Sequence, residues 1–223
     1  MNTRILSLAF LTFLATGAFA DSTNAAPSLL PNSGFEEIDP TNSARPRGWD
    51  TLDGLGVRWV TETNGAPNRL IRMNTAVSEK DYVASCKAAG LEKWVFPDAA
   101  GNPIAATYGL SYYSDWIPTA TGQAYRLTFR FRGAGGGKVW VRGYGLLRNE
   151  ERHRFDTIVN CRGTGKEWKT FSQCFHPTRQ TPTVTRMRIM LYAYWPPGVY
   201  EFDDVMVAPV SAEEWLADHR ENE

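Results

Sequence analysis

The stretch that decides the fold is GVYEFDDVMV, residues 198–207, near the end of a chain of 223 residues. Aromatic and β-branched side chains dominate it and a Pro-Pro-Gly turn opens it, which together predict a β-strand. Two adjacent acids, Asp203 and Asp204, are unusual inside a strand, because a buried carboxylate needs a partner. NSGFEE, residues 32–37, carries further acids near the other end of the chain. We therefore expect the first strand, over residues 29–38, to pair with the last.

The middle of the chain alternates apolar and polar residues in the way that is typical of antiparallel strands. The alternation is clearest over residues 125–132, 139–144 and 183–195, where apolar side chains would line a core and the positions between them carry arginines and aromatic rings. Shorter strands are predicted at 57–61 and 69–73. With almost no helical periodicity, the pattern predicts an all-β fold, a two-sheet antiparallel β-sandwich or jelly roll.

The sandwich is expected to occupy residues 29–210. A capping box, Ser-Ala-Glu-Glu, begins the tail of residues 211–223 and predicts a short C-terminal helix. The pattern weakens over residues 74–102, so we expect a long irregular excursion with about one helical turn; such loops are often functional or cover a sheet face.

Residues 1–20 have the features of a signal peptide. Arg4 supplies the positive start, residues 5–14 are apolar, and Ala18-Phe19-Ala20 is a small-residue cleavage site. The sequence predicts cleavage after Ala20, a linker over residues 21–28, and a secreted or periplasmic protein. No later stretch is long and apolar enough to predict a membrane span.

The charge balance limits the classes of partner. The chain carries 24 Lys and Arg against 24 Asp and Glu, and 13% of its residues are aromatic. A balanced charge argues against a nucleic-acid partner bound through bulk electrostatics.

Three cysteines occur, Cys86, Cys161 and Cys174. Export permits disulfides. Cys161 and Cys174 flank a Gly-rich turn that could join two antiparallel strands, so we expect a bridge between them, worth about 3 kcal/mol by loop closure. The alternative is that Cys86 pairs with one of the two.

An ordered set of short motifs resembles a known family. The motifs are Asn-x-Gly-Phe-Glu, Gly-Trp, Gly-x-x-Tyr-x-Leu-x-Phe, Glu-Trp-Lys-x-Phe and Phe-Asp-Asp-Val. They lie at Asn32–Glu36, Gly48–Trp49, Gly122–Phe129, Glu167–Phe171 and Phe202–Val205. Together they resemble the jelly-roll carbohydrate-binding modules of the galactose-binding-like superfamily, over most of the mature chain.

This resemblance implies a structural calcium ion where the N-terminal Glu approaches the C-terminal Asp pair. Carried over to this chain, the ligands are Glu36 with one or both of Asp203 and Asp204, and backbone carbonyls complete the six to eight oxygens that calcium takes. Strand alternation predicts Asp203 on the same face as Val205, with Asp204 on the other face. The alternative is that these acids cap loop amides or pair with arginine.

The resemblance also implies a glycan ligand. Sugars are held by flat aromatic rings and planar hydrogen-bonding groups, and arginine suits carboxylate or sulfate. If the strands form one concave sheet, an acidic polysaccharide is expected on the face formed by Trp140, Arg142, Tyr144, Arg126, Arg130, Arg186, Arg188, Tyr192 and Tyr194. The Tyr112-Tyr113 pair and Trp116 are further aromatic candidates, with at least one of them expected in the core, and Trp195 could form a platform at a loop tip. The alternative is a solvated face whose aromatic rings are buried under residues 74–102.

Catalysis and protein binding are the competing functions. No nucleophile elbow, His-Glu-x-x-His motif or phosphate-binding loop is present. A jelly-roll polysaccharide lyase or glycoside hydrolase would have to use residues such as His153 with Tyr144 and Arg152, or carboxylates among Glu150, Glu151 and Asp156. A protein-binding surface or structural ectodomain could use the same sandwich. The sequence favours an exported, non-catalytic protein that binds a polysaccharide.

Overall fold

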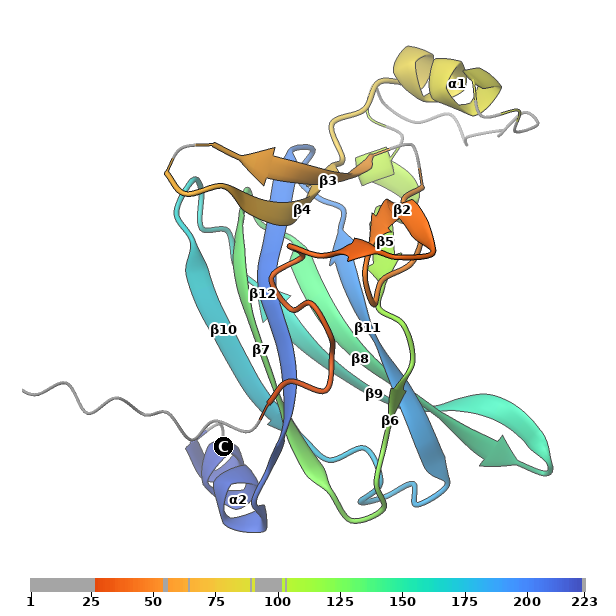
Figure 1. Cartoon of the computed structure of the whole chain (residues 1–223), viewed down its shortest axis with the longest axis vertical. Coiled ribbons are helices and arrows are strands. Elements are labelled where there is room, and N and C mark those ends of the chain that lie inside the picture. The colour runs from red at the N-terminus through yellow and green to blue at the C-terminus, as the bar shows by residue number, and fades with distance from the viewer. Residues whose placement is uncertain are drawn as a thin grey trace, which may run out of the picture.

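The computed structural model describes residues 27–53, 56–63, 65–88, 90, 102 and 104–221. Within them the chain forms two antiparallel sheets packed face to face, with one helix at each end of the molecule (Figure 1). The predicted signal peptide, residues 1–20, lies outside the described residues.

The first sheet contains β3 (Val57–Glu62), β4 (Asn68–Asn74), β7 (Ala124–Gly133), β10 (Lys169–Phe175) and β12 (Val199–Val210). We call it the β12 sheet; its order is β10-β7-β12-β4-β3. The strand that decides the fold, β12, is therefore central, with β7 on one side and β4 on the other, both antiparallel.

The second sheet contains β5 (Leu110–Tyr113), β6 (Ile117–Pro118), β8 (Gly137–Leu147), β9 (Glu150–Cys161) and β11 (Val184–Ala193). We call it the β8 sheet; its order is β5-β11-β8-β9, with β6 paired to β11. The long hairpin of β8 and β9 extends beyond the body of the sandwich (Figure 1, lower right). The short strands β1 (Ile38–Asp39) and β2 (Asn42–Pro46) form a separate ribbon near the N-terminus.

The core lies between the two sheets and follows the predicted alternation. It is formed from one side by Leu127, Phe129 and Phe131 of β7, and from the other by side chains such as Val141 and Ile189, all fully buried. Each large apolar side chain buried in this way contributes about 1.5–3 kcal/mol. The predicted two-sheet antiparallel sandwich is confirmed.

The adjacent acids in β12 mark a bulge. The register of β12 against β7 shifts between Asp203 and Met206, and Asp204 has a left-handed φ of 50°. Phe202 and Val205 consequently both belong to the core. The prediction that alternation places Asp203 on the face of Val205 is wrong, because the bulge resets the alternation.

The N-terminal segment meets β12, but it is not a strand. The Leu29 amide donates to the Val207 carbonyl at 2.7 Å, and the Val205 amide donates to the Ser33 carbonyl at 2.9 Å. The predicted approach of the two ends is therefore confirmed, whereas the strand predicted over residues 29–38 is wrong.

The Asn-x-Gly-Phe-Glu motif explains the irregular path. Asn32 and Phe35 have left-handed φ values of 56° and 60°. The Asn32 amide group donates to the Glu37 carbonyl at 2.9 Å and to the Arg47 carbonyl at 3.2 Å, and its Oδ1 accepts from the Glu37 amide. Phe35, thus turned inward, packs against the buried Trp49 at 4.8 Å between ring centroids. The motif closes one edge of the core.

The predicted C-terminal helix is confirmed as α2 (Ala212–Glu221), with the Ser211 hydroxyl accepting from the Glu214 amide at 3.1 Å. It packs on the β12 sheet. The second helix, α1 (Glu79–Ala88), is longer than the single predicted turn and stands beyond the β3 end of the sandwich (Figure 1). A single π-helical turn, η1 (Ile104–Tyr108), follows.

The predicted disulfide is wrong. Cys86, Cys161 and Cys174 are all buried free thiols. Cys161 faces the main core, whereas Cys174 packs with Trp215 beneath α2. The prediction assumed that the Gly-rich turn joins neighbouring strands, but β9 and β10 belong to different sheets.

Candidate functional site

The outward side chains of the β8 sheet form a continuous surface, which we call the Trp140 face. Its members are Tyr113, Trp116, Lys138, Trp140, Arg142, Tyr144, His153, Asp156, Ile158, Arg186, Arg188, Met190, Tyr192 and Tyr194. Within it Trp140 lies opposite Met190 of β11 and Ile158 of β9. Directly opposed residues have Cβ atoms about 4.5–5.5 Å apart. The register therefore brings together residues predicted from separate strands.

Trp116 is at the centre of an aromatic and guanidinium stack. The Arg186 guanidinium lies 3.8 Å and that of Arg188 5.0 Å from its ring centroid, and Arg188 also lies 4.9 Å from the ring of Tyr113. Tyr144 meets Trp116 edge-to-face at 5.1 Å. Trp116 nevertheless remains 41% exposed. The stack holds an exposed indole in one orientation, as an aromatic binding platform requires.

The two arginines of this stack already have anionic partners. Arg186 Nε donates to Glu151 Oε1 at 2.7 Å and its Nη2 donates to the second oxygen of the same carboxylate. Arg188 donates to Asp50 Oδ2 and to the Ser114 carbonyl, each at 2.7 Å. A carboxylate or sulfate on a ligand would have to displace these partners. The stack is therefore better suited to an uncharged part of a ligand.

A polar group lies beside the stack, where β8 pairs with β9. His153 Nε2 is 2.8 Å from Asp156 Oδ1, and Arg142 Nε is 3.6 Å from the same oxygen. The rings of Tyr144 and His153 are 5.3 Å apart. Among the described residues, the buried Nε1 of Trp140 and Nε of Arg142 have no hydrogen-bond partner. These two N–H groups are therefore buried donors without a partner in the described structure.

The opposite end of the Trp140 face is aromatic as well. Tyr192 and Tyr194 stack at 5.5 Å, and the Lys138 ammonium lies 5.3 Å from the ring of Tyr194. Burial raises the pKa of Tyr192, with a further contribution from Tyr194. Trp195, the next residue, is 53% exposed.

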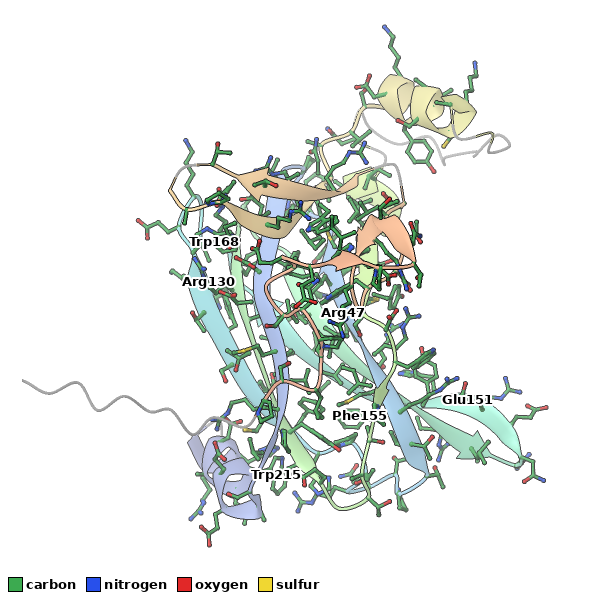
Figure 2. All side chains as sticks on the ribbon, viewed as in Figure 1. Arg47, Arg130, Glu151, Phe155, Trp168 and Trp215 are labelled. Carbon is green, nitrogen blue, oxygen red and sulfur yellow. The ribbon has the colours of Figure 1, made fainter. Side chains whose placement is uncertain are left out.

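Arg126 and Arg130 do not belong to this face. Both are on β7 of the β12 sheet, on the other side of the sandwich. Arg126 pairs with Glu214 of α2 at 2.8 Å, and Arg130 pairs with Asp204 at 3.2 Å and stacks on Trp168 at 4.9 Å (Figure 2). The expectation of one sheet carrying all the predicted arginines is wrong, because β7 and β8 are joined by a turn that crosses between the sheets.

The predicted calcium-binding acids are held by protein donors. Asp203 is fully buried; its Oδ2 accepts from the Asn68 amide group at 3.0 Å and its Oδ1 from the Asp204 amide at 2.8 Å. Burial raises the pKa of Asp203 to about 6. Glu36 Oε1 accepts from the Arg69 amide at 2.7 Å.

A calcium ion at these acids would have to compete with the Arg130 guanidinium. The Arg130 guanidinium lies 3.2 Å from Asp204 and 3.8 Å from Asp203, where a competing cation would have to bind. Across the part of the chain that the structure describes, no three His, Cys, Asp or Glu side chains are grouped to hold a metal. Calcium binding stays a prediction.

The described helices include none that is long and apolar enough to cross a membrane.

No protein-family model matches the sequence, and no curated protein matches it. Among solved structures, the arabinose-bound α-L-arabinofuranosidase MgGH51 is 13% identical over 85% of this chain, with a TM-score of 0.52. The enzymatically active domain of tailspike protein 4 of bacteriophage CBA120 is 12% identical over 82%, with a TM-score of 0.50. This chain spans only 27% and 21% of those two chains.

Carbohydrate-binding modules are also among the matches. The xylan-binding domain CBM22-1 of Paenibacillus barcinonensis Xyn10C is 11% identical over 84% of this chain and 97% of its own, with a TM-score of 0.46. At such identities the likeness concerns the fold alone. The predicted sandwich fold agrees with the likeness to the arabinofuranosidase and the tailspike domain, whose TM-scores are 0.52 and 0.50.

Proposed function

We propose that this protein is an exported, non-catalytic glycan-binding protein that holds a polysaccharide on the Trp140 face. The observation that carries the proposal is the exposed but rigidly stacked ring of Trp116, flanked by Tyr144 and Arg186. Sugar rings present apolar C–H faces surrounded by hydroxyl groups, and a fixed aromatic ring with nearby planar donors complements both.

Hydrogen bonding on this face supports a neutral or weakly charged sugar. Trp140 Nε1 and Arg142 Nε lack partners among the described residues, but both atoms are buried, so a sugar hydroxyl would reach them only if these side chains move. Arg186 and Arg188 are engaged by Glu151 and Asp50, so their charge is largely compensated. Recognition of an acidic polysaccharide therefore needs cationic groups elsewhere in the molecule.

Export is proposed from the sequence of residues 1–20 alone. A charged start, an apolar run and a small-residue cleavage site are typical of a secretory leader, with cleavage after Ala20. The test is N-terminal sequencing of the protein recovered outside the cytoplasm, which should begin at Asp21.

A glycan-array screen of residues 21–223, with calcium present and product release monitored, tests the function. Trp116→Ala should lower affinity at least tenfold, because truncating an aromatic anchor costs about 2 kcal/mol or more. Trp168→Ala, just before β10 on the other sheet's side of the sandwich, is the matched control and should leave affinity unchanged. Equal binding by wild type and Trp116→Ala would remove the Trp140 face from consideration, and no binding to any glycan would favour a protein partner.

One observation favours a second candidate, a jelly-roll polysaccharide lyase or glycoside hydrolase. His153 and Asp156 form a hydrogen-bonded pair with Arg142 and Tyr144 beside it, a set that could supply a base, an acid and a carboxylate-binding cation. Release of shortened products that His153→Ala abolishes would assign the chain to this class. Binding without products would retain the non-catalytic proposal.

A further inference from the structure

A cavity of about 480 Å³ opens at the edge of the sandwich, between β9 of one sheet and β10 of the other. The loop after β10 and helix α2 close its far side. Phe155 of β9 and Trp215 of α2, both labelled in Figure 2, line it. Its size lies within the range of small-molecule sites, and no motif in the sequence indicated it.

The lining of the cavity is cationic. Arg154 and Arg179 both line it, and among the described residues neither forms an ion pair with a carboxylate. Asp156 is the one acid among the lining residues; its Oδ1 is hydrogen-bonded to His153 at 2.8 Å, and the Arg142 guanidinium at 3.6 Å offsets its charge. This contrasts with the Trp140 face, whose arginines are paired.

Buried donors in the lining lack partners. Trp215 is only 7% exposed, yet its Nε1 has no hydrogen-bond partner within the described ranges, and the same holds for Nδ1 of His176. The Arg179 guanidinium lies 4.4 Å from the Trp215 ring centroid, which orients its N–H groups. An unpaired buried donor is costly, and a ligand oxygen would satisfy it.

The cavity and the Trp140 face share a border. Asp156 lines the cavity and also lies opposite Arg142 of the face, because β9 is the edge strand of the β8 sheet. A chain lying across the face can therefore turn its end around β9 into the cavity.

We infer that this cavity binds the terminal acidic sugar of the glycan, with the sugar's carboxylate or sulfate ester held by Arg154 and Arg179. The inference rests on the proposed glycan-binding function and deepens it. It moves acid recognition from the arginines of the sheet face, which pair with carboxylates, to two arginines at the sheet edge, which have no carboxylate partner within the described part of the chain. Charge-assisted hydrogen bonds from arginine to an oxyanion are stronger than neutral ones, so the acidic end group would dominate selectivity.

The test uses residues 21–223 and an array of matched oligosaccharides: chains ending in a uronic acid, the same chains as methyl esters, chains ending in a sulfated sugar, and their neutral counterparts. The uronic-acid and sulfate arms separate the two sources of the oxyanion. Acid-ended chains should bind at least tenfold more tightly than their neutral counterparts. Arg154→Gln and Arg179→Gln should each remove most of that preference, whereas Arg162→Gln, in the loop after β9, should not.

Trp215→Phe provides a second readout, because it keeps an aromatic ring in place while it removes the Nε1 donor together with part of the indole; it should weaken binding of the acid-ended chains. Binding that depends on Trp116 but shows no preference for acid-ended chains would overturn the cavity inference and leave the proposed function standing. An acid preference unchanged in Arg154→Gln and Arg179→Gln would also overturn it. Absence of binding to every glycan would overturn both.

Discussion

The guanidinium of Arg186 lies 3.8 Å from the ring centroid of Trp116 while its nitrogens bind Glu151. This contact joins an exposed indole to the protruding hairpin. We expect Arg186→Ala to lower the free energy of unfolding slightly and to weaken glycan binding, because Trp116 loses its fixed orientation. Urea unfolding and titration measure the two effects. Arg152→Ala, which breaks an exposed pair with Glu150 near the hairpin tip, is the control and should change neither.

Glu201 is the buried centre of an ion-pair group on the β12 sheet. It is 5% exposed, binds Arg72 at 2.6 Å and also binds Arg132. Removing this buried anion leaves Arg72 without its carboxylate and Arg132 with Glu62 alone, so Glu201→Ala should cost on the order of 3 kcal/mol. Glu150→Ala, at the exposed hairpin tip, should cost less than about 1 kcal/mol. Equal losses in chemical denaturation would contradict the structural role given to Glu201.

Chelation separates the two interpretations of the acid pair. Because Arg130 pairs with Asp203 and Asp204, we expect the melting temperature of the purified protein to be unchanged by EDTA. A fall in melting temperature that calcium restores, and that Asp203→Ala combined with Asp204→Ala abolishes, would instead support the calcium ion that the sequence predicts.

We expect the free energy of unfolding to depend on pH through the imidazole of His176. Burial lowers its pKa, and the positive charge of Arg179 adds to the effect. The folded state therefore binds fewer protons than the unfolded state, whose histidine titrates near its ordinary value of about 6.5. The contribution of His176 is fully present above that pH and is lost as the pH falls through the lower folded-state pKa.

Urea unfolding at several pH values between 7.5 and 5 measures this loss as the difference between wild type and His176→Gln. Titrating groups common to both proteins, Asp203 included, cancel in that difference. A difference that does not change with pH would contradict the lowered pKa.

Most of the strand pattern was predictable from local sequence. The alternation of Leu127, Phe129 and Phe131 with polar neighbours is enough to place one face of β7 inside, because successive side chains in a strand point to opposite faces. The capping box at Ser211 likewise predicted α2, since a cap acts within one helical turn. The bulge at Asp204 was not predictable from alternation, because it depends on pairing with β7.

The candidate site was predicted only in part. The sequence correctly grouped Trp140, Arg142 and Tyr144, which share one strand. It also grouped Arg126 and Arg130 with them, although β7 lies in the other sheet. Sheet membership depends on which way each turn crosses the sandwich, and a Gly-rich turn permits either path.

What the sequence by itself determined is the class of fold, the inward and outward faces of the main strands, and the C-terminal helix, all of which follow from short-range periodicity and capping. The tertiary structure alone decided which side chains meet. It paired Arg186 with Glu151 and Arg188 with Asp50, left Arg154 and Arg179 without acids among the described residues, and separated Cys161 from Cys174. These are contacts between segments distant in the chain, and they are set by strand order and register, which local patterns do not encode.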